Sequence, residues 1–196
     1  MRITPDWKDS DGKGLIDIGW ALEYEGTISS DDDIVIELGS RTKWLKVTGS
    51  LSSKRNIVAR ESIMAGDDIK AAKEIKAGSA IEAGGDIVAG GSINTGAALV
   101  AGKGIKAGGA IEARGDIEAG TSIMAGEGIK SNYSIKAGGA IVAGEGIKAI
   151  VGIKSGEDIK AGLGIKACWD IESGGDIVAG GAIEAKEVRK WCQKVG

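Results

Sequence analysis

An aliphatic residue recurs at every sixth position from Leu45 to Ile183, and this period restricts the chain to very few folds. All 24 positions hold Ile or Leu, and the pattern ends at Arg189. Two residues after each aliphatic stands a small residue, with Val47 as the exception, and a glycine usually follows. A period of six does not match the 3.6-residue helical turn, and so much glycine would destabilise a helix. A helical fold is therefore excluded.

The repeating unit x-x-Ile-x-Ala-Gly has the pattern of a short strand followed by a turn. Residues i and i+2 of a strand point to the same side, so Ile and Ala face inward together while the residue between them faces water. The glycine is expected to turn the chain with a positive φ at no steric cost. A strand and a turn in every six residues produce a coiling chain with a continuous Ile core.

The exceptions to the turn glycine indicate how many sides the coil has. Apart from Thr48 and Lys54 in the irregular first coil, and Ala72 off the column, they are separated by multiples of 18 residues: Arg60, Arg114, Asn132, Ile150, Cys168 and Lys186. Three units per coil predict an all-β fold, a triangular parallel β-helix (β-solenoid) of about eight 18-residue coils. At roughly 4.8 Å per coil, the rod would be about 38 Å long.

The unit resembles the repeat of the hexapeptide-repeat parallel β-helix proteins over Leu45–Lys186. Left-handed hexapeptide acyltransferases in this class carry a small residue two positions before the aliphatic and typically use a histidine base. Here that position is variable and often charged, as at Glu61 and Asp67, and the chain has no histidine. The bactofilins form right-handed triangular solenoids that polymerise into filaments, and the chain is similar to them in architecture only. This resemblance implies a right-handed solenoid, and it identifies no functional residue.

Both ends of the rod are expected to be capped, because an open solenoid end exposes unpaired strand edges. Residues 1–44 are interpreted as an N-terminal β cap around the 45–186 solenoid, with strands at Leu15–Trp20 and Asp33–Leu38. Three tryptophans are placed to cover the first coil: Trp7, Trp20 and Trp44. Residues 187–196 are interpreted as a C-terminal helical cap, since four apolar residues fall at i, i+3, i+4 and i+7: Val188, Trp191, Cys192 and Val195.

The absence of histidine excludes more functions than any motif supports. It removes Ser-His and Cys-His nucleophile pairs, His-ligated zinc and the usual general base of neutral pH. Two cysteines cannot build a four-thiolate metal site, and no phosphate-binding G-x-x-x-x-G-K-[ST] loop occurs. The acidic segment 9–17 is interpreted as a turn and not a Ca²⁺ loop, because Lys13 and Trp20 stand where ligands belong. We therefore expect no catalytic residue, metal or cofactor.

Hydropathy and charge indicate where such a chain works. No apolar stretch approaches the roughly 20 residues of a membrane span, and the first ten residues lack the layout of a signal peptide. We expect a soluble cytoplasmic protein with no membrane partner, and free thiols at Cys168 and Cys192. Residues 1–44 hold ten acids and five bases, residues 45–186 seventeen of each, and residues 187–196 one acid and three bases. The head is thus acidic and the tail basic, which is typical of a solubility feature or of head-to-tail attraction.

One corner of the predicted coil gathers bulky side chains in three successive coils. The core positions are already filled by Ile and Ala, so these side chains cannot all be buried. They are Asn132, Tyr133, Ile150, Val151, Cys168 and Trp169. An exposed ridge of this kind predicts a partner interface or a dimer seam. The alternatives are that the C-terminal tail folds back with Trp191 on the ridge, or that the exposure is tolerated.

Two outward columns are weaker candidates. The first is a partly apolar column that suggests a secondary interface, or equally a solvated face with Lys stems lying over valine: Val88, Met124, Val142 and Val178. The second is a stack of lysines, which suggests an anionic partner such as nucleic acid: Lys130, Lys148 and Lys166, with Lys136 and Lys154 on the next face. Glu127 and Glu145 lie close enough in sequence to offset these charges, so nucleic acid is not the expected partner.

The leading hypothesis is a non-enzymatic interaction module, a rigid rod that binds a protein partner and is homodimeric through the ridge. A small chain with no catalytic residue of this kind suits a phage- or plasmid-encoded inhibitor that blocks a host enzyme. The first alternative is a bactofilin-like filament subunit, and the second is a binder of anionic polymers.

Overall fold

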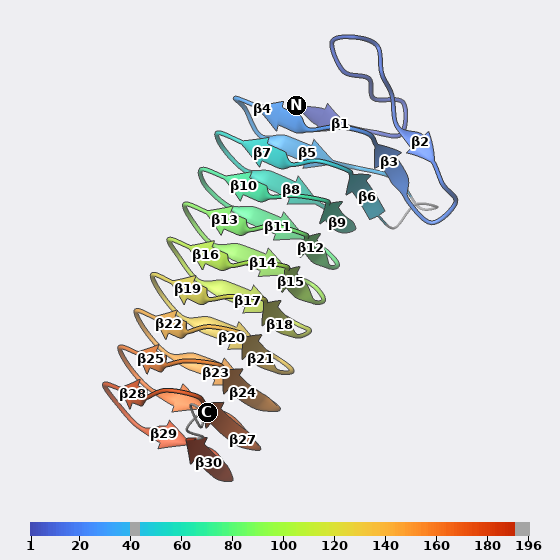
Figure 1. Cartoon of the computed structure of the whole chain (residues 1–196). Helices are drawn as coiled ribbons and strands as arrows, with labels where there is room; N and C mark the ends of the chain where they lie inside the picture. The colour runs from blue at the N-terminus through green and yellow to red at the C-terminus, as the bar shows by residue number, and fades with distance from the viewer. Residues whose placement is uncertain (40–43, 191–196) are drawn as a thin grey trace, which may run out of the picture.

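The structure, a computed structural model, describes residues 1–39 and 44–190. Within those residues every regular element is a β-strand, and the strands stack coil upon coil into an elongated rod (Figure 1). The described residues contain no helix that could cross a membrane. The predicted all-β solenoid of about eight coils is confirmed, because each coil contributes one strand to each of three sheets.

Sheet I is wholly parallel and contains the first strand of each coil. In spatial order its strands are β4 (Ile28–Ser30), β7 (Leu51–Ser53), β10 (Ile69–Ala71), β13 (Ile87–Ala89), β16 (Ile105–Ala107), β19 (Ile123–Ala125), β22 (Ile141–Ala143), β25 (Ile159–Ala161) and β28 (Ile177–Ala179).

Sheet II contains the second strand of each coil and is also parallel. Its strands are β1 (Arg2–Ile3), β5 (Ile34–Ile36), β8 (Ile57–Ala59), β11 (Ile75–Ala77), β14 (Ile93–Thr95), β17 (Ile111–Ala113), β20 (Ile129–Ser131), β23 (Ile147–Ala149), β26 (Ile165–Lys166) and β29 (Ile183–Glu184).

Sheet III contains the third strand of each coil and starts with one antiparallel pair, β2 with β3. Its strands are β2 (Ile16–Asp17), β3 (Leu22–Tyr24), β6 (Trp44–Val47), β9 (Ser62–Ala65), β12 (Ile81–Ala83), β15 (Leu99–Ala101), β18 (Ile117–Ala119), β21 (Ile135–Ala137), β24 (Gly152–Ser155), β27 (Asp170–Ser173) and β30 (Glu187–Lys190).

The core is a stack of like residues held in register from coil to coil. Ile69 pairs with Ile87, and Ile87 pairs with Ile105, so the same side chain type fills the same core site along the rod. Ile63, Ile81 and their equivalents are fully buried. Each such side chain contributes roughly 1.5–3 kcal/mol of burial free energy before the cost of ordering the chain is subtracted.

The turn glycines serve a different purpose from the one expected. Positive φ occurs only at Gly12, Gly19, Gly26 and Gly39 among the described glycines, all of them N-terminal to the regular repeat. A Cβ placed on Gly102 would lie 2.2 Å from the carbonyl oxygen of Gly84 in the preceding coil. The predicted positive φ is therefore wrong for these turns, and glycine is needed because the coils approach too closely for a side chain.

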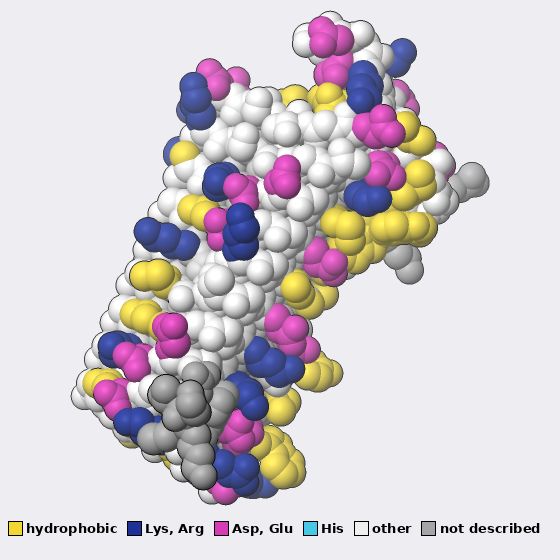
Figure 2. Space-filling model, in the orientation of Figure 1, with side chains coloured by type: hydrophobic (Ala, Val, Ile, Leu, Met, Phe, Trp, Pro, Cys, Tyr) yellow, Lys and Arg dark blue, Asp and Glu magenta, His cyan; other side chains and the backbone are white. Residues whose placement is uncertain are grey.

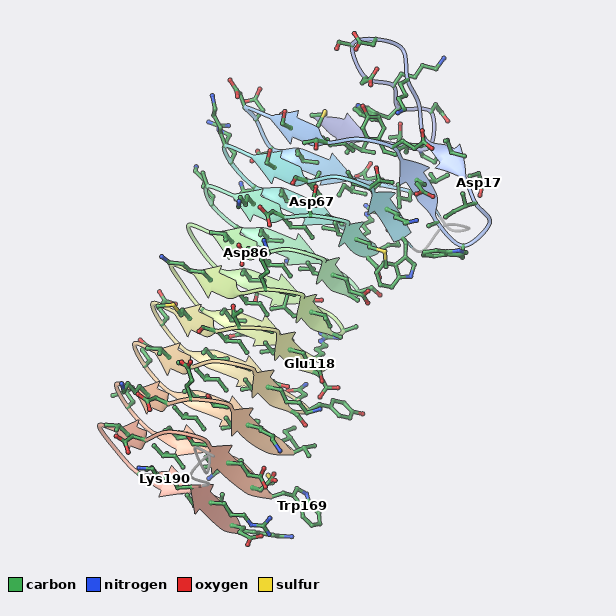
Figure 3. All side chains as sticks on the ribbon, viewed as in Figure 1. Asp17, Asp67, Asp86, Glu118, Trp169 and Lys190 are labelled. Atoms are coloured by element: carbon green, nitrogen blue, oxygen red, sulfur yellow. The ribbon has the colours of Figure 1, made fainter. Side chains whose placement is uncertain are left out.

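Polar residues just before the core Ile also join successive coils. Asp68 Oδ1 accepts a hydrogen bond from the Asp86 N–H at 2.8 Å, and Asp86 Oδ1 accepts one from the Gly104 N–H at 2.8 Å. The side-chain hydrogen bond from Lys70, together with the Asp86 N–H, lowers the pKa of the Asp68 carboxyl. Both carboxylates precede strands of sheet I, and Asp86 is labelled in Figure 3. They satisfy backbone N–H groups that the turn leaves without a carbonyl partner.

The solenoid begins one coil earlier than the sequence indicated. Strands β3, β4 and β5 form a complete coil inside the segment interpreted as a cap, with Leu22, Ile28 and Ile34 in the core. Ile34 and Leu45 are 11 residues apart, so an insertion of five residues breaks the period and hides this coil. The expected strands at 15–20 and 33–38 are found only as Ile16–Asp17 and Ile34–Ile36.

The C-terminal prediction is wrong where the structure describes it. Residues 187–190 form β30, which pairs in parallel with β27, so the coil continues where a helix was expected. Arg189, which ends the aliphatic pattern, occupies an outward position and pairs with Glu172. The remaining part of the expected helix, residues 191–196 with Trp191, Cys192 and Val195, lies outside the described residues.

Candidate interaction surface

The six residues predicted as an interface lie together on one long edge of the rod, where sheet II turns into sheet III. We call this set the ridge: Asn132, Tyr133, Ile150, Val151, Cys168 and Trp169. A backbone ladder joins its coils, because the Val151 N–H donates to the Tyr133 carbonyl and the Trp169 N–H donates to the Val151 carbonyl, each at 3.0 Å. The side chains of Tyr133, Ile150 and Trp169 are 57%, 48% and 58% exposed. The ridge is thus an accessible apolar surface.

Bulky residues in the turns before sheet III form the ridge. Several strands of sheet III start at their core aliphatic residue, as β12 and β15 do, whereas β24 and β27 are among those that start one residue earlier, at Gly152 and Asp170. The turns before them hold Ile150-Val151 and Cys168-Trp169, where the coils at 78–79 and 96–97 have Gly-Ser and Gly-Ala. Trp169 points away from the rod beside β27 and β30 (Figure 3), and hydrophobic side chains recur along this edge of the surface (Figure 2).

A cation covers one face of the ridge at its C-terminal end. The Lys186 Nζ lies 3.8 Å from the centroid of the Trp169 ring, a cation–π contact. Cys168 beside it is an exposed free thiol. Trp191, which the alternative interpretation places on the ridge, lies outside the described residues.

The N-terminal tryptophans divide into two groups. Trp7 packs edge-on against the buried Tyr24, with ring centroids 5.4 Å apart, and joins the core of the first coil. The rings of Trp20 and Trp44 also pack edge-on, with centroids 6.5 Å apart, but Trp20 is 52% exposed. Trp44 is in register with Ser62 at the start of sheet III, so this pair lies on the same long edge as the ridge. The sequence pattern did not reveal this shared position, because it depends on the five-residue insertion.

The secondary interface residues line the middle of sheet I. Met124 and Val178 are exposed, whereas Val88 and Val142 are half-buried. Met124 and Val142 are neighbours in register, and lysines separate this pair from Val88 and from Val178. The lysine at position 160 forms an ion pair with Asp158 at 2.7 Å. The face therefore mixes apolar and charged positions and offers a weaker apolar surface than the ridge.

The predicted lysine stack lies in register on sheet II, with Lys130 beside Lys148 and Lys148 beside Lys166. Acidic residues accompany it in one shallow hollow of about 540 Å³, lined by Glu112, Glu127, Glu145 and Glu184. The Lys166 Nζ contacts the Glu184 carboxylate at 2.5 Å, and this hydrogen bond raises the pKa of Lys166.

On sheet III the two remaining candidate lysines are neutralised by ion pairs. Lys136 pairs with Glu118 at 3.1 Å, and Lys154 pairs with Glu172 at 3.0 Å. The two lysines are neighbours in register and lie between the two acids, since Glu118, Lys136, Lys154 and Glu172 occupy successive coils. The candidate anion-binding surface is therefore a mixed surface.

The acidic N-terminal segment has the geometry of a turn. Asp9 Oδ1 accepts hydrogen bonds from the N–H groups of Asp11 and Lys13, and Asp9 Oδ2 accepts one from the Tyr24 hydroxyl at 2.6 Å. The described residues contain no cluster of three or more acidic, cysteine or histidine side chains arranged to hold a metal ion.

A comparison of the chain with protein-family models, curated proteins and solved structures finds no match.

Proposed function

We propose that the chain is a non-enzymatic protein-interaction module, a rigid solenoid rod that forms a homodimer and binds a protein partner. The ridge supports this proposal. Large apolar side chains project from three adjacent coils of a rigid backbone, and a contiguous exposed apolar patch is typical of an association surface. Tyr and Trp, which dominate the energetics of many interfaces, stand at its two ends.

A binding role also agrees with the form of the solenoid. The regular repeat from Leu45 to Ile183 has no long loop that could build a substrate cleft. A rod with outward columns fixed by register instead presents side chains at constant spacing to a flat partner surface. A phage- or plasmid-encoded inhibitor that blocks a host enzyme by occupying its surface would need only this property.

Sedimentation velocity over a hundredfold concentration range tests the proposal. We expect a discrete dimer that Trp169→Glu converts to monomer without lowering the melting temperature. Leu163→Glu is the matched control, because Leu163 is 59% exposed on a different edge, where sheet I turns into sheet II. A monomer at every concentration, or a dimer unaffected by Trp169→Glu, would overturn the homodimer part of the proposal.

A bactofilin-like filament subunit is the second candidate, and the C-terminal end of the described rod supports it. Core-position residues Ile183 and Val188 are 40% and 50% exposed there, and β28, β29 and β30 each end a sheet. Unpaired strand edges favour further pairing. Long polymers in the same sedimentation experiment, insensitive to Trp169→Glu, would make this the favoured function.

A further inference from the structure

The edge of the rod that carries the ridge also carries a stretch of small side chains. The three coils on its N-terminal side place small residues, and one arginine, in the same two columns. We call this set the shelf: Gly78, Ser79, Gly96, Ala97, Arg114 and Gly115. Its ladder matches that of the ridge, because the Ala97 N–H donates to the Ser79 carbonyl at 3.2 Å and the Gly115 N–H donates to the Ala97 carbonyl at 3.0 Å. Ridge and shelf are therefore continuous and each is three coils long.

A hollow of about 390 Å³ lies along the sheet II side of the shelf. Gly78, Gly96 and Arg114 of the shelf line it, together with Asn132 at the start of the ridge. The concave surface of the edge is thus directly next to its convex surface.

The boundary between shelf and ridge is a defined point in the backbone. The shelf ends at Gly115 and the ridge residue in the next coil is Tyr133. Between these two residues a side-chain hydroxyl takes the place of the direct backbone hydrogen bond. The Ser131 Oγ donates to the Gly115 carbonyl at 2.8 Å and accepts from the Tyr133 N–H at 2.9 Å. The edge changes from small to bulky side chains at this rung.

We propose that two copies of this chain pack antiparallel along this edge, with the ridge of each copy seated on the shelf of the other. This inference rests on the proposed homodimer and specifies its arrangement. A two-fold axis placed at the boundary, perpendicular to the rod, reverses the order of the coils and leaves each column facing itself. It brings bulky residues onto small ones, in the pairs Tyr133 with Gly115, Val151 with Ala97, Trp169 with Ser79, Ile150 with Gly96 and Cys168 with Gly78.

Charge supports a second copy as the occupant. An antiparallel pair sets the acidic segment 1–39 of each copy at the same end as Arg189 and Lys190 of the other. One coil beyond shelf and ridge, Arg60 of one copy faces Lys186 of the other and Glu61 faces Glu187, so opposite charges are only diagonal neighbours there and charge favours the pairing only at the ends of the rods. Oppositely charged ends favour this orientation over a parallel one, in which like ends would lie together.

Disulfide trapping tests the arrangement. In a Cys168→Ser, Cys192→Ser background, one chain carries Ala97→Cys and a second, differently tagged chain carries Val151→Cys. We expect a disulfide between the two chains after mixing and mild oxidation. Each variant alone should give none, because the two copies of either position are three coils apart, about 14 Å at 4.8 Å per coil, whereas a disulfide needs Cα atoms within about 7 Å.

The shelf is also tested without altering the ridge. Ala97→Trp places a large side chain on the shelf where Val151 of the other copy would pack, and we expect it to weaken dimerisation at least tenfold. Lys103→Trp, on the edge between sheets III and I, should have no effect. Three results would overturn the antiparallel arrangement and leave the homodimer standing. The first is a disulfide between two copies of Ala97→Cys or two copies of Val151→Cys, and the second is no mixed disulfide in a preparation that is dimeric by sedimentation. The third is full dimerisation of Ala97→Trp. A monomer at all concentrations would overturn both.

Discussion

The Ser131 hydroxyl donates a hydrogen bond to the Gly115 carbonyl oxygen 2.8 Å away, one coil earlier in the rod. Ser131 is buried and replaces the alanine that most coils carry at this position. Its hydroxyl also accepts the Tyr133 N–H. One side chain thus satisfies two backbone groups at the rung where the surface of the edge changes.

We predict that Ser131→Ala lowers the free energy of unfolding by about 1 kcal/mol, the usual net value of a buried neutral hydrogen bond. Chemical denaturation measures the change. Ser134→Ala is a control, because Ser134 lies three residues away and no hydrogen bond of its hydroxyl is seen among the described residues. An unchanged midpoint for Ser131→Ala would mean that the Tyr133 N–H and the Gly115 carbonyl pair directly, as in neighbouring coils.

The core prediction concerns Ile117, which is fully buried near the middle of sheet III. We expect Ile117→Ala to cost about 2–5 kcal/mol and Ile117→Val about 0.5–1.5 kcal/mol, because the removed methyl groups leave a cavity in a packed stack. Glu118→Ala, next along the strand but outward, should cost at most about 1 kcal/mol as an exposed ion pair is lost. Equal costs at positions 117 and 118 would contradict the assigned inward and outward faces.

Two turn glycines test whether glycine is needed because neighbouring coils lie too close for a side chain or because the backbone must be free to turn. Gly102→Ala should destabilise by about 1–3 kcal/mol, because the new Cβ would overlap the Gly84 carbonyl at 2.2 Å. Gly181→Ala should change stability by less than about 0.5 kcal/mol, because its nearest neighbour is 3.5 Å away. Thermal melts of the two variants distinguish these effects, and similar melting temperatures would count against the steric explanation.

The pH dependence of stability has a contribution from the Asp9–Tyr24 pair. The hydrogen bond from the Tyr24 hydroxyl lowers the pKa of Asp9 below its ordinary 3.8 and raises the pKa of Tyr24 above its ordinary 10.0. The Asp9 contribution is therefore present above pH 3.8 and is lost as the pH falls through the lowered pKa. The Tyr24 contribution is present below pH 10.0 and is lost as the pH rises through the raised pKa.

We accordingly expect Tyr24→Phe to flatten the profile of melting temperature against pH at both its acidic and its alkaline ends. Tyr133→Phe serves as the control, because the exposed Tyr133 hydroxyl makes no hydrogen bond among the described residues, and its profile should follow that of the unaltered chain. A Tyr24→Phe profile parallel to that of the unaltered chain would show that the pair contributes nothing to the pH dependence.

The repeat by itself determined the architecture of this protein. A period of six with Ile and Ala two residues apart allows only a strand with one buried face, and the 18-residue spacing of exceptions such as Arg114, Asn132 and Ile150 sets three strands per coil. Side-chain alternation along a strand is strictly local, so the inward and outward positions follow from the order of the residues alone. The stacking of Tyr133, Val151 and Trp169 follows from the same spacing.

Features that depend on contacts between coils were decided only by the tertiary structure. The first coil was hidden because an insertion between Ile34 and Leu45 breaks the period, although the strands still pair. The positive-φ expectation failed because the requirement at Gly102 is the short distance to the preceding coil. At the C-terminus, pairing with β27 outweighs the helical spacing that includes Val188, since a strand edge offers each backbone N–H and C=O a partner. Sequence periodicity determines which residues of an element share a face, whereas contacts with neighbouring strands determine whether the element is a strand or a helix.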